Sequence, residues 1–177
     1  MIILEHTAEE NAIIQTAQMM CQAARTAPKT RGLDYIHTAI LTDEDKNKLA
    51  DEMDRLGSEL DYAFFSRDAN NVRTSTAVVL IGIKNVPRGL NEGCQFCGFE
   101  NCQACTKASG KCAYTGMDLG IATGSAVSVA ADLRADNRVM FSVGRTAMEM
   151  GIMGADICQC VGIPLSATGK SPVFDRK

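Results

Sequence analysis

The chain has 177 residues, of which 46% are hydrophobic, and this is enough apolar material for one domain with a sizeable core. The formal net charge is −3 and the basic residues are scattered, which excludes the clustered Lys and Arg of a nucleic-acid-binding surface. No stretch is long and apolar enough to span a bilayer, and the N-terminus lacks the pattern of a secretion signal. We therefore expect a cytoplasmic protein that binds neither nucleic acid nor membrane.

The first helix is predicted between Thr7 and Pro28. Thr7 and Glu10, three residues later, have the spacing of a capping box, and apolar residues then recur at helical intervals. Pro28 is expected to end the helix, because proline disfavours a helical conformation in the residue before it. A strand of mixed polarity is predicted to follow over residues 35–41.

A second helix is predicted from Thr42, as its N-cap, to Gly57, a residue type that commonly ends helices. A shorter helix is expected around Phe64. The clearest strand covers residues 76–83 (TAVVLIGI), a short apolar run rich in β-branched residues. Such runs are typical of strands that are buried on both faces.

The last third of the chain predicts two helices and a strand. Residues 117–134 form a helix with several small side chains, Asp136 caps the next helix, and residues 157–163 form a final strand. Helices and strands follow one another without a strict βαβ rhythm. We therefore predict a single α+β domain over residues 1–177, in which a central mixed or antiparallel sheet is flanked by helices.

Residues 89–111 differ from the rest of the chain, because they are rich in Gly and Cys and show little periodicity. Five cysteines lie in or beside this stretch: Cys94, Cys97, Cys102, Cys105 and Cys112. A hydrophobic core cannot order such a segment unaided, but metal ligation can replace apolar burial as the source of order. Because cytosolic cysteines rarely form structural disulfides, their clustering here indicates a metal site within a Cys-rich segment, residues 89–115.

The spacing of these cysteines bears on the identity of the metal. Thiolates select soft centres, which leaves zinc or an iron–sulfur cluster. Zinc sites usually separate their two CxxC pairs by a longer stretch than the four residues between Cys97 and Cys102. We therefore predict a 4Fe-4S cluster and keep a structural zinc site in a binding module without redox function as the alternative.

The segment Cys94-x2-Cys97-Gly98-x3-Cys102 resembles the four-iron cluster motif of small ferredoxin-type modules in electron-transport and corrinoid proteins. In that motif a more distant cysteine completes the ligand set, and here the fourth ligand is either Cys105 or Cys112. Over its whole length the chain resembles a bacterial and archaeal family described as ferredoxin-domain-containing proteins, in residues 25–32, the Cys run and residues 162–170. This resemblance implies cluster binding but no established reaction. From the predicted cluster itself we expect a protein that passes single electrons to a redox partner protein or to a bound flavin.

The segment Ala23-Ala-Arg-Thr-Ala-Pro28 is similar to the stretch that ends the first long helix of the flavin-dependent nitroreductases and lies against FMN. This similarity implies an oxidoreductase with a central sheet, forming a homodimer with FMN at the subunit interface. The Arg-rich N-terminal motif that holds the FMN phosphate in that family is missing here. The cofactor contacts would therefore fall to the following basic residues: Arg25, Lys29, Arg31, Lys170 and Arg176.

Overall fold

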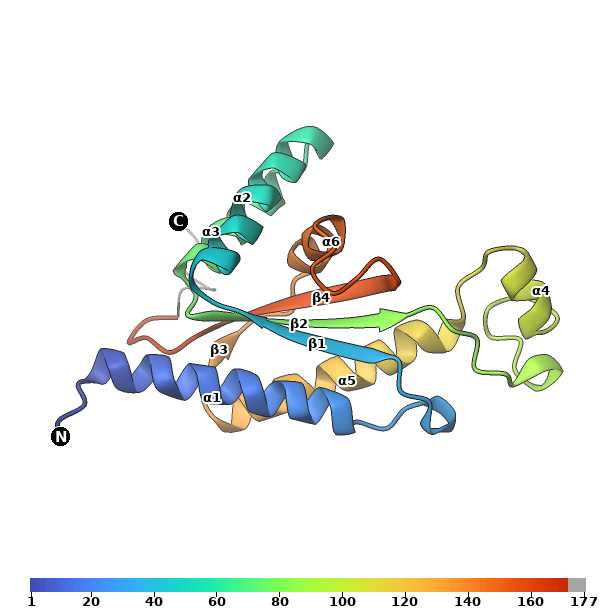
Figure 1. The fold of residues 1–177 in the computed structure, drawn as a ribbon, viewed down its shortest axis with the longest axis horizontal. Helices are drawn as coiled ribbons and strands as arrows, with labels where there is room; N and C mark the ends of the chain where they lie inside the picture. The colour runs from blue at the N-terminus through green and yellow to red at the C-terminus, as the bar shows by residue number, and fades with distance from the viewer. Residues whose placement is uncertain (172–177) are drawn as a thin grey trace.

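The computed structural model describes residues 1–171 and is built around a four-stranded antiparallel sheet of order β1-β2-β4-β3 (Figure 1). The strands are β1 (Ile36–Leu41), β2 (Ala77–Lys84), β3 (Asp136–Asn137) and β4 (Ile157–Ser166). The helices are α1 (Glu5–Thr26), α2 (Asp43–Leu60), α3 (Ala63–Thr74), α4 (Cys102–Lys107), α5 (Ala113–Asp132) and α6 (Phe141–Glu149), with short 3-10 turns η1 (Thr30–Gly32) and η2 (Asn91–Gly93). The α+β fold with a central antiparallel sheet is confirmed.

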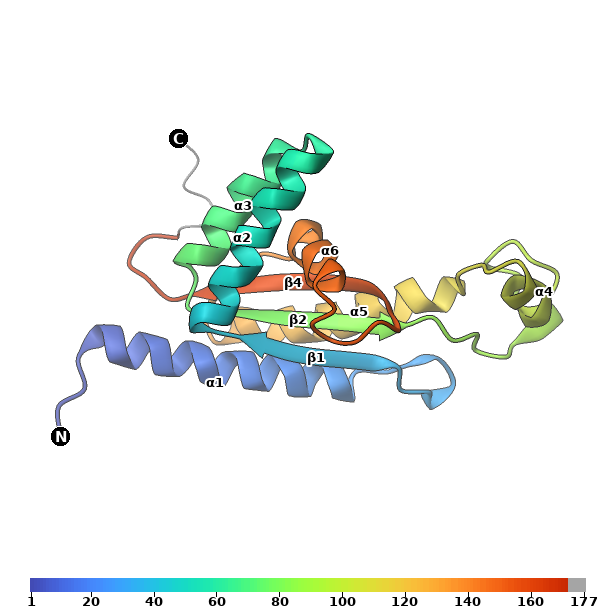
Figure 2. The same cartoon turned by 45° about the horizontal axis from the view of Figure 1, so that its top comes forward.

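Helices cover both faces of the sheet (Figures 1 and 2). α1 and α5 lie on one face, and α2, α3 and α6 lie on the other. The central strand β2 supplies both cores, because alternate residues of a strand point to opposite faces. Val79 and Ile81 therefore pack toward α1 and α5, whereas Val78 and Leu80 pack toward α2, α3 and α6. This double burial explains why β2 is apolar at almost every position.

Helix α6 packs directly on the backbone of β4 through two glycines. A Cβ atom on Gly144 would lie 2.0 Å from the carbonyl oxygen of Cys160, and one on Gly162 would lie 2.0 Å from Cγ1 of Val143. Only residues without a side chain permit this approach. The contact holds α6 against the sheet and, as described below, forms one wall of a pocket.

Two predicted helix boundaries in the first half were wrong. α1 begins at Glu5, so Thr7 lies inside its first turns and Leu4 is the N-cap. α2 continues through Gly57 to Leu60 and ends at Asp61, which has a left-handed conformation. Gly57 instead allows close packing against α3, because a Cβ atom there would lie 2.7 Å from Cβ of Phe65.

The prediction that Asp136 caps a helix was also wrong. Asp136 and Asn137 form the short strand β3, which pairs with Ser166 and Leu165 of β4. β4 runs past the predicted end at Ile163, and its additional residues provide the partner for this strand. The following helix α6 therefore starts only at Phe141.

Residues 89–112, here called the Cys lobe, project beyond the end of the sheet (Figure 1). The lobe begins after β2, contains η2 and α4, and returns to the body of the protein at the start of α5. In the part of the chain that the structure describes, no helix has the length and hydropathy needed to cross a membrane.

Candidate metal centre and the adjoining pocket

The Cys lobe has almost no hydrophobic core of its own. Among residues 89–112, Cys105 alone is buried, and the aromatic ring of Phe96 is 64% exposed. A segment of this length cannot be ordered by the burial of one side chain, because the entropy cost of fixing each residue is about 1–2 kcal/mol. Hydrogen bonds, such as those of Asn85 and Asn101 described below, therefore have to supply part of the order of the lobe.

The cysteine thiols gather around Cys105. Burial raises the pKa of this thiol, and its hydrogen bond with Cys97 and the nearby thiol groups of Cys97, Cys112 and Cys102 raise it further. Each of these three cysteines is thus within electrostatic reach of Cys105. Cys94 is half-buried at the end of η2. The structure therefore places Cys97, Cys102 and Cys112 near Cys105.

Two contacts inside the lobe hold its backbone close to the cysteines. Gly110 lies against Cys105 and Phe99, because a Cβ atom there would be 3.0 Å from the Cys105 Sγ and 2.7 Å from the Phe99 ring. Asn101 caps α4 by accepting a hydrogen bond from the Ala104 N–H at 2.9 Å, and its amide group donates to Glu92 at 3.2 Å. The cap thereby ties α4, which carries Cys102 and Cys105, to η2.

Asn85, just after β2, fastens the lobe to the body of the protein. Its Nδ2 donates to the Gly110 carbonyl oxygen at 3.0 Å, and its Oδ1 accepts from the Cys112 N–H at 3.1 Å. The hydroxyl of Thr115 donates to the same Oδ1 at 3.4 Å. Sequence reasoning did not identify Asn85, although a polar residue directly after a buried strand and before the Cys run was a signal.

A buried ion pair joins the base of the lobe to α5. Arg88 and Asp118 are 1% and 2% exposed in their side chains, and Arg88 Nη2 lies 2.9 Å from Asp118 Oδ2. The other carboxylate oxygen of Asp118 accepts hydrogen bonds from the Thr30 N–H at 3.0 Å and from the Thr30 hydroxyl at 2.8 Å. The Arg88 guanidinium lies 4.8 Å above the ring of Tyr35. This pair therefore connects the α1–β1 loop, the base of the lobe and α5.

The thiols around Cys105 are soft donors, which suit zinc or an iron–sulfur cluster. Within residues 1–171, no three Cys, His, Asp or Glu side chains are placed to hold one metal ion together. A zinc ion requires all its thiolates at about 2.3 Å from one point. In a 4Fe-4S cluster each cysteine binds a different iron, so the four sulfur atoms stand farther apart. The soft donor set around Cys105 is compatible with that group.

Three of the basic residues predicted for flavin binding lie in or beside the α1–β1 loop, and each already contacts an acceptor of the chain itself. Arg25 forms an ion pair with Asp34 at 2.6 Å. The ammonium group of Lys29 donates to the Ala27 carbonyl oxygen at 2.9 Å and also contacts the carbonyl oxygen of Arg25. Arg31 Nη1 donates to the carbonyl oxygen of Arg88 at 2.8 Å. All three hold the α1–β1 loop in place beside the Cys lobe.

The other two predicted flavin contacts lie elsewhere. Lys170 follows β4 at the end of the sheet where Leu165 pairs with Ala77, whereas the α1–β1 loop precedes Ile36 at the opposite end. Arg176 lies outside the described residues. One protomer therefore does not bring Lys170 together with the other predicted cations, and within the described residues the expected phosphate site is not assembled in a single chain.

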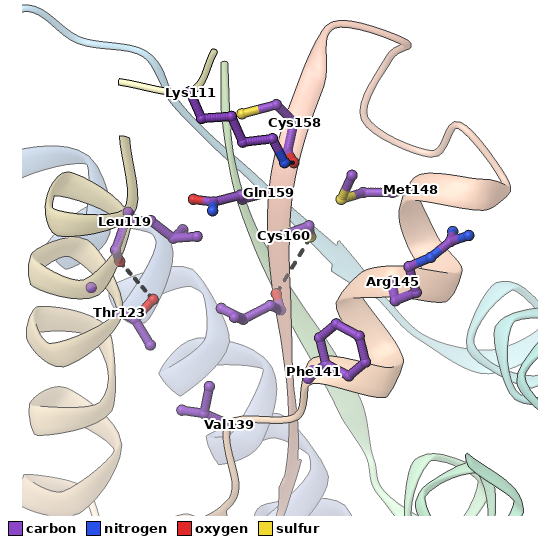
Figure 3. Close-up of a pocket in the computed structure, with 13 residues that line it drawn as sticks. Lys111, Leu119, Thr123, Val139, Phe141, Arg145, Met148, Cys158, Gln159 and Cys160 are labelled. Atoms are coloured by element: carbon purple, nitrogen blue, oxygen red, sulfur yellow. Dashed lines mark hydrogen bonds between the residues drawn. The ribbon is translucent and has the colours of Figure 1, made fainter. Parts of the chain in front are cut away.

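A pocket of about 720 Å³ adjoins the Cys lobe (Figure 3). Its floor is β4 from Cys158 to Val161, one wall comes from α5 and the other from α6 and the residues before it. Most lining side chains are apolar. Lys111, the residue before Cys112, lies at one end and donates to the Cys158 carbonyl oxygen at 3.4 Å.

The two cysteines of β4 face opposite cores, although residues two apart in a regular strand share a face. A β-bulge at Cys158 explains the difference, because Ile83 pairs with Gln159 while the next residue, Lys84, pairs with Ile157. Burial raises the pKa of Cys158 and raises that of Cys160 to about 12. Both are thus protonated thiols at neutral pH rather than reactive thiolates.

Comparison with known proteins identifies a family and a fold. A family described as "uncharacterized protein containing a ferredoxin domain" matches residues 108–176. A protein of Archaeoglobus fulgidus is 41% identical over 184 aligned residues, which cover 99% of this chain and 98% of that protein. The chain belongs to this ferredoxin-domain family. The family match begins after Cys105, so of the five cysteines of the run it includes Cys112 alone.

Solved structures similar to this ferredoxin-domain protein include nitroreductases and other oxidoreductases, some of which are described with FMN. A putative NADH dehydrogenase/NAD(P)H nitroreductase of Bacteroides thetaiotaomicron has a TM-score of 0.56 at 12% identity, over 92% of this chain and 80% of that one. The NADPH:FMN oxidoreductase of Vibrio harveyi has a TM-score of 0.56 at 14% identity, over 92% of this chain and 63% of that one. These similarities establish the nitroreductase-like fold that the sequence predicted.

Proposed function

We propose that this ferredoxin-domain protein binds a 4Fe-4S cluster in the Cys lobe and serves as a redox protein that transfers single electrons to a partner protein. The observation that carries the proposal is the gathering of Cys97, Cys102 and Cys112 around the one buried residue of the lobe, Cys105. Ligation energy can replace the missing apolar core of this segment. The description of the family as containing a ferredoxin domain supports a redox role.

The cluster, when bound, supplies one-electron oxidation and reduction, and the residues of the chain set how readily this occurs. Gly110 keeps the backbone close to the Cys105 sulfur, and its N–H donates to the Cys105 carbonyl oxygen at 2.8 Å, which holds this approach in place. Glu92 is held within the lobe by its hydrogen bond from Asn101, and its negative charge favours the oxidised state. The Arg88–Asp118 pair fixes the lobe relative to α5.

The direct test is a substitution of one thiol near the centre. In protein purified without oxygen, Cys97→Ser should lose most of its iron and acid-labile sulfide, because serine is a poor ligand for this soft centre. Cys21→Ser is the matched control, since Cys21 lies on α1 and packs against the core. Unchanged iron in the Cys97 variant would remove the basis of the proposal.

The same measurement separates the cluster from a structural zinc site. A brown protein with about four iron atoms per chain supports the redox function, since a 4Fe-4S cluster contains that number. A colourless protein with one zinc ion per chain would instead make the lobe a structural module in a binding protein.

A flavin-dependent oxidoreductase is the second candidate, and its support is the fold shared with FMN oxidoreductases. Because Lys170 lies far from Arg25, Lys29 and Arg31 in one protomer, a phosphate site that uses both groups needs a second copy of the chain. Denaturing the purified protein should then release FMN, detected by its fluorescence. A protein that contains iron but releases no flavin would support electron transfer alone.

A further inference from the structure

The Cys lobe contains five cysteines, whereas a cluster of the proposed kind takes four thiolate ligands. One thiol therefore has no iron to bind. The sequence alone leaves either Cys105 or Cys112 as the extra residue, because the first three cysteines have the spacing of a four-iron motif. The contacts within the lobe indicate a different residue.

Cys105 lies among the other thiols of the lobe. Its side chain is buried, although the lobe has almost no apolar core. Its thiol forms a hydrogen bond with Cys97 and lies within electrostatic reach of Cys102 and Cys112. Of the five cysteines, all of which the structure describes, Cys94 alone has no such effect on Cys105. The buried thiol and its three neighbours therefore form a set of four.

Two thiols of this set lie on one helix. The side chain of Asn101 accepts a hydrogen bond from the Ala104 N–H, so α4 begins at Cys102. Cys102 and Cys105 are then three residues apart, and residues at this spacing share one side of a helix. The helix holds this spacing itself, so both thiols are positioned before a cluster binds.

A third thiol of the set, Cys112, is held by the body of the protein. Asn85 accepts a hydrogen bond from the Cys112 N–H at 3.1 Å and donates one to the Gly110 carbonyl oxygen at 3.0 Å. The Gly110 N–H in turn donates to the Cys105 carbonyl oxygen at 2.8 Å. These three contacts tie the segment that carries Cys112 both to Cys105 and to the end of β2.

A change of chain direction separates Cys94 from Cys97. Gln95 has a left-handed backbone with φ of 55°, and its carbonyl oxygen accepts from the Gly98 N–H at 2.9 Å. The hydrogen-bonded turn therefore runs from Gln95 to Gly98 and encloses Cys97. Cys94 precedes this turn, and its own N–H donates to the Asn91 carbonyl oxygen at 3.2 Å. Cys97 thus belongs to the turn, and Cys94 belongs to η2.

We propose that Cys94 remains a free thiol and that the cluster is bound by the other four cysteines of the lobe: Cys97, Cys102, Cys105 and Cys112. This assignment rests on the proposed function, since it presupposes a cluster in the lobe. It makes both Cys105 and Cys112 ligands, and it excludes the first cysteine of the motif seen in the sequence.

Alanine variants purified without oxygen test the assignment. Cys94→Ala should keep the iron and acid-labile sulfide content of the parent protein. Because a free thiol can replace a lost ligand, Cys105→Ala and Cys112→Ala are each made in the Cys94→Ala background. Each double variant should lower the iron content at least about fivefold, since loss of even an outer partner of a ligand costs about 10- to 100-fold in metal affinity.

Alkylation of the parent protein tests the same assignment without a substitution, so it is independent of how well the variants fold. Iodoacetamide is added to the iron-loaded protein without oxygen, and the modified cysteines are identified by peptide mass spectrometry. Cys94, Cys97, Cys102 and Cys112 are all half-buried, so a difference between them reports ligation rather than access. Cys94 should react in the loaded protein, whereas the other three should react only after the iron is chelated.

The outcomes separate this assignment from the cluster itself. With iron present in the parent protein, the assignment is overturned by loss of iron from Cys94→Ala or by full retention of iron in either double variant. Protection of Cys94 equal to that of Cys97 would overturn it as well. A parent protein without iron would instead overturn the proposed cluster and the assignment together.

Discussion

At the scale of single residues, the thiol of Cys160 makes stability depend on pH. Burial raises its pKa to about 12 from an ordinary value of 9.0. Between these values the unfolded chain loses the thiol proton while the folded chain keeps it, so the free energy of unfolding decreases as pH rises. Below pH 9 both states are protonated and the effect vanishes.

Cys160→Ala should therefore flatten the loss of stability in alkali. Between about pH 9 and 11 the free energy of unfolding should fall less steeply with pH in the variant than in the parent protein. The two slopes should differ by up to about 1.4 kcal/mol per pH unit. Urea unfolding at several pH values gives this slope for the parent protein and for the variant. Because the other groups that titrate in this range are the same in both proteins, their contributions cancel in the difference. Parallel slopes would mean that the Cys160 thiol is not shielded from ionisation.

The cysteine run could be predicted from the sequence because thiol chemistry and spacing are local properties. The residues that position the lobe could not, because their partners are distant in the chain. Thr30 and Asp118 are separated by 88 positions, and Asn85 and Gly110 by 25. No spacing rule connects such pairs before the sheet and helices bring them together.

At the scale of elements, the Arg88–Asp118 pair should contribute most to holding α5, the α1–β1 loop and the lobe together. Asp118→Asn leaves the buried Arg88 guanidinium without its counter-charge and should reduce the free energy of unfolding by about 3–5 kcal/mol. Arg88→Met combined with Asp118→Leu should recover part of that loss, since no buried charge remains. Denaturant unfolding measures both.

The exposed Arg25–Asp34 pair provides the matched control. Its distance of 2.6 Å is shorter than that of the buried pair, but both side chains are well exposed. Asp34→Asn should cost less than about 1 kcal/mol, because solvent screens the attraction. A loss as large as that of Asp118→Asn would show that burial does not decide the strength of these pairs.

The packing of α6 on β4 depends on the missing side chain of Gly144. An added methyl group meets the Cys160 carbonyl group, so Gly144→Ala should destabilise the fold by about 1–3 kcal/mol or more. Gly124→Ala on α5 has open space and should stabilise its helix by up to about 1 kcal/mol. Thermal unfolding of both variants compares them, and equal effects would contradict the close contact.

The elements that could be predicted are those specified by their own residues. β2 is recognisable because an apolar, β-branched run is suited to burial on both faces. β3 is not recognisable in this way, because Asp136 and Asn137 form a strand only by pairing with Ser166 and Leu165 at the end of β4. Gly57 was misread for a related reason, since its small size serves the packing of α3 rather than the end of α2.

At the scale of the whole molecule, one of the exposed apolar surfaces among the described residues runs along α5. Tyr114, Met117 and Ile121 recur at helical spacing along α5. The exposed ring of Phe96 stacks on the ring of Tyr114, with 5.8 Å between the two ring centroids. The strip therefore runs from the Cys lobe onto the body of the protein. A contiguous apolar strip of this kind usually marks an interaction surface.

We propose that this strip pairs with its own copy across a two-fold axis, as in most homodimers, where each subunit contributes the same surface. Ile121→Glu should then yield a monomer, because the dimer would bury two unpaired carboxylates. Leu133→Glu is the control, since Leu133 is also 46% exposed but lies beyond the end of α5. Light scattering should give twice the 19.0 kDa chain mass for the parent protein and for the Leu133 variant. A parent protein that remains at the single-chain mass, or an Ile121 variant that remains dimeric, would rule out pairing through this surface.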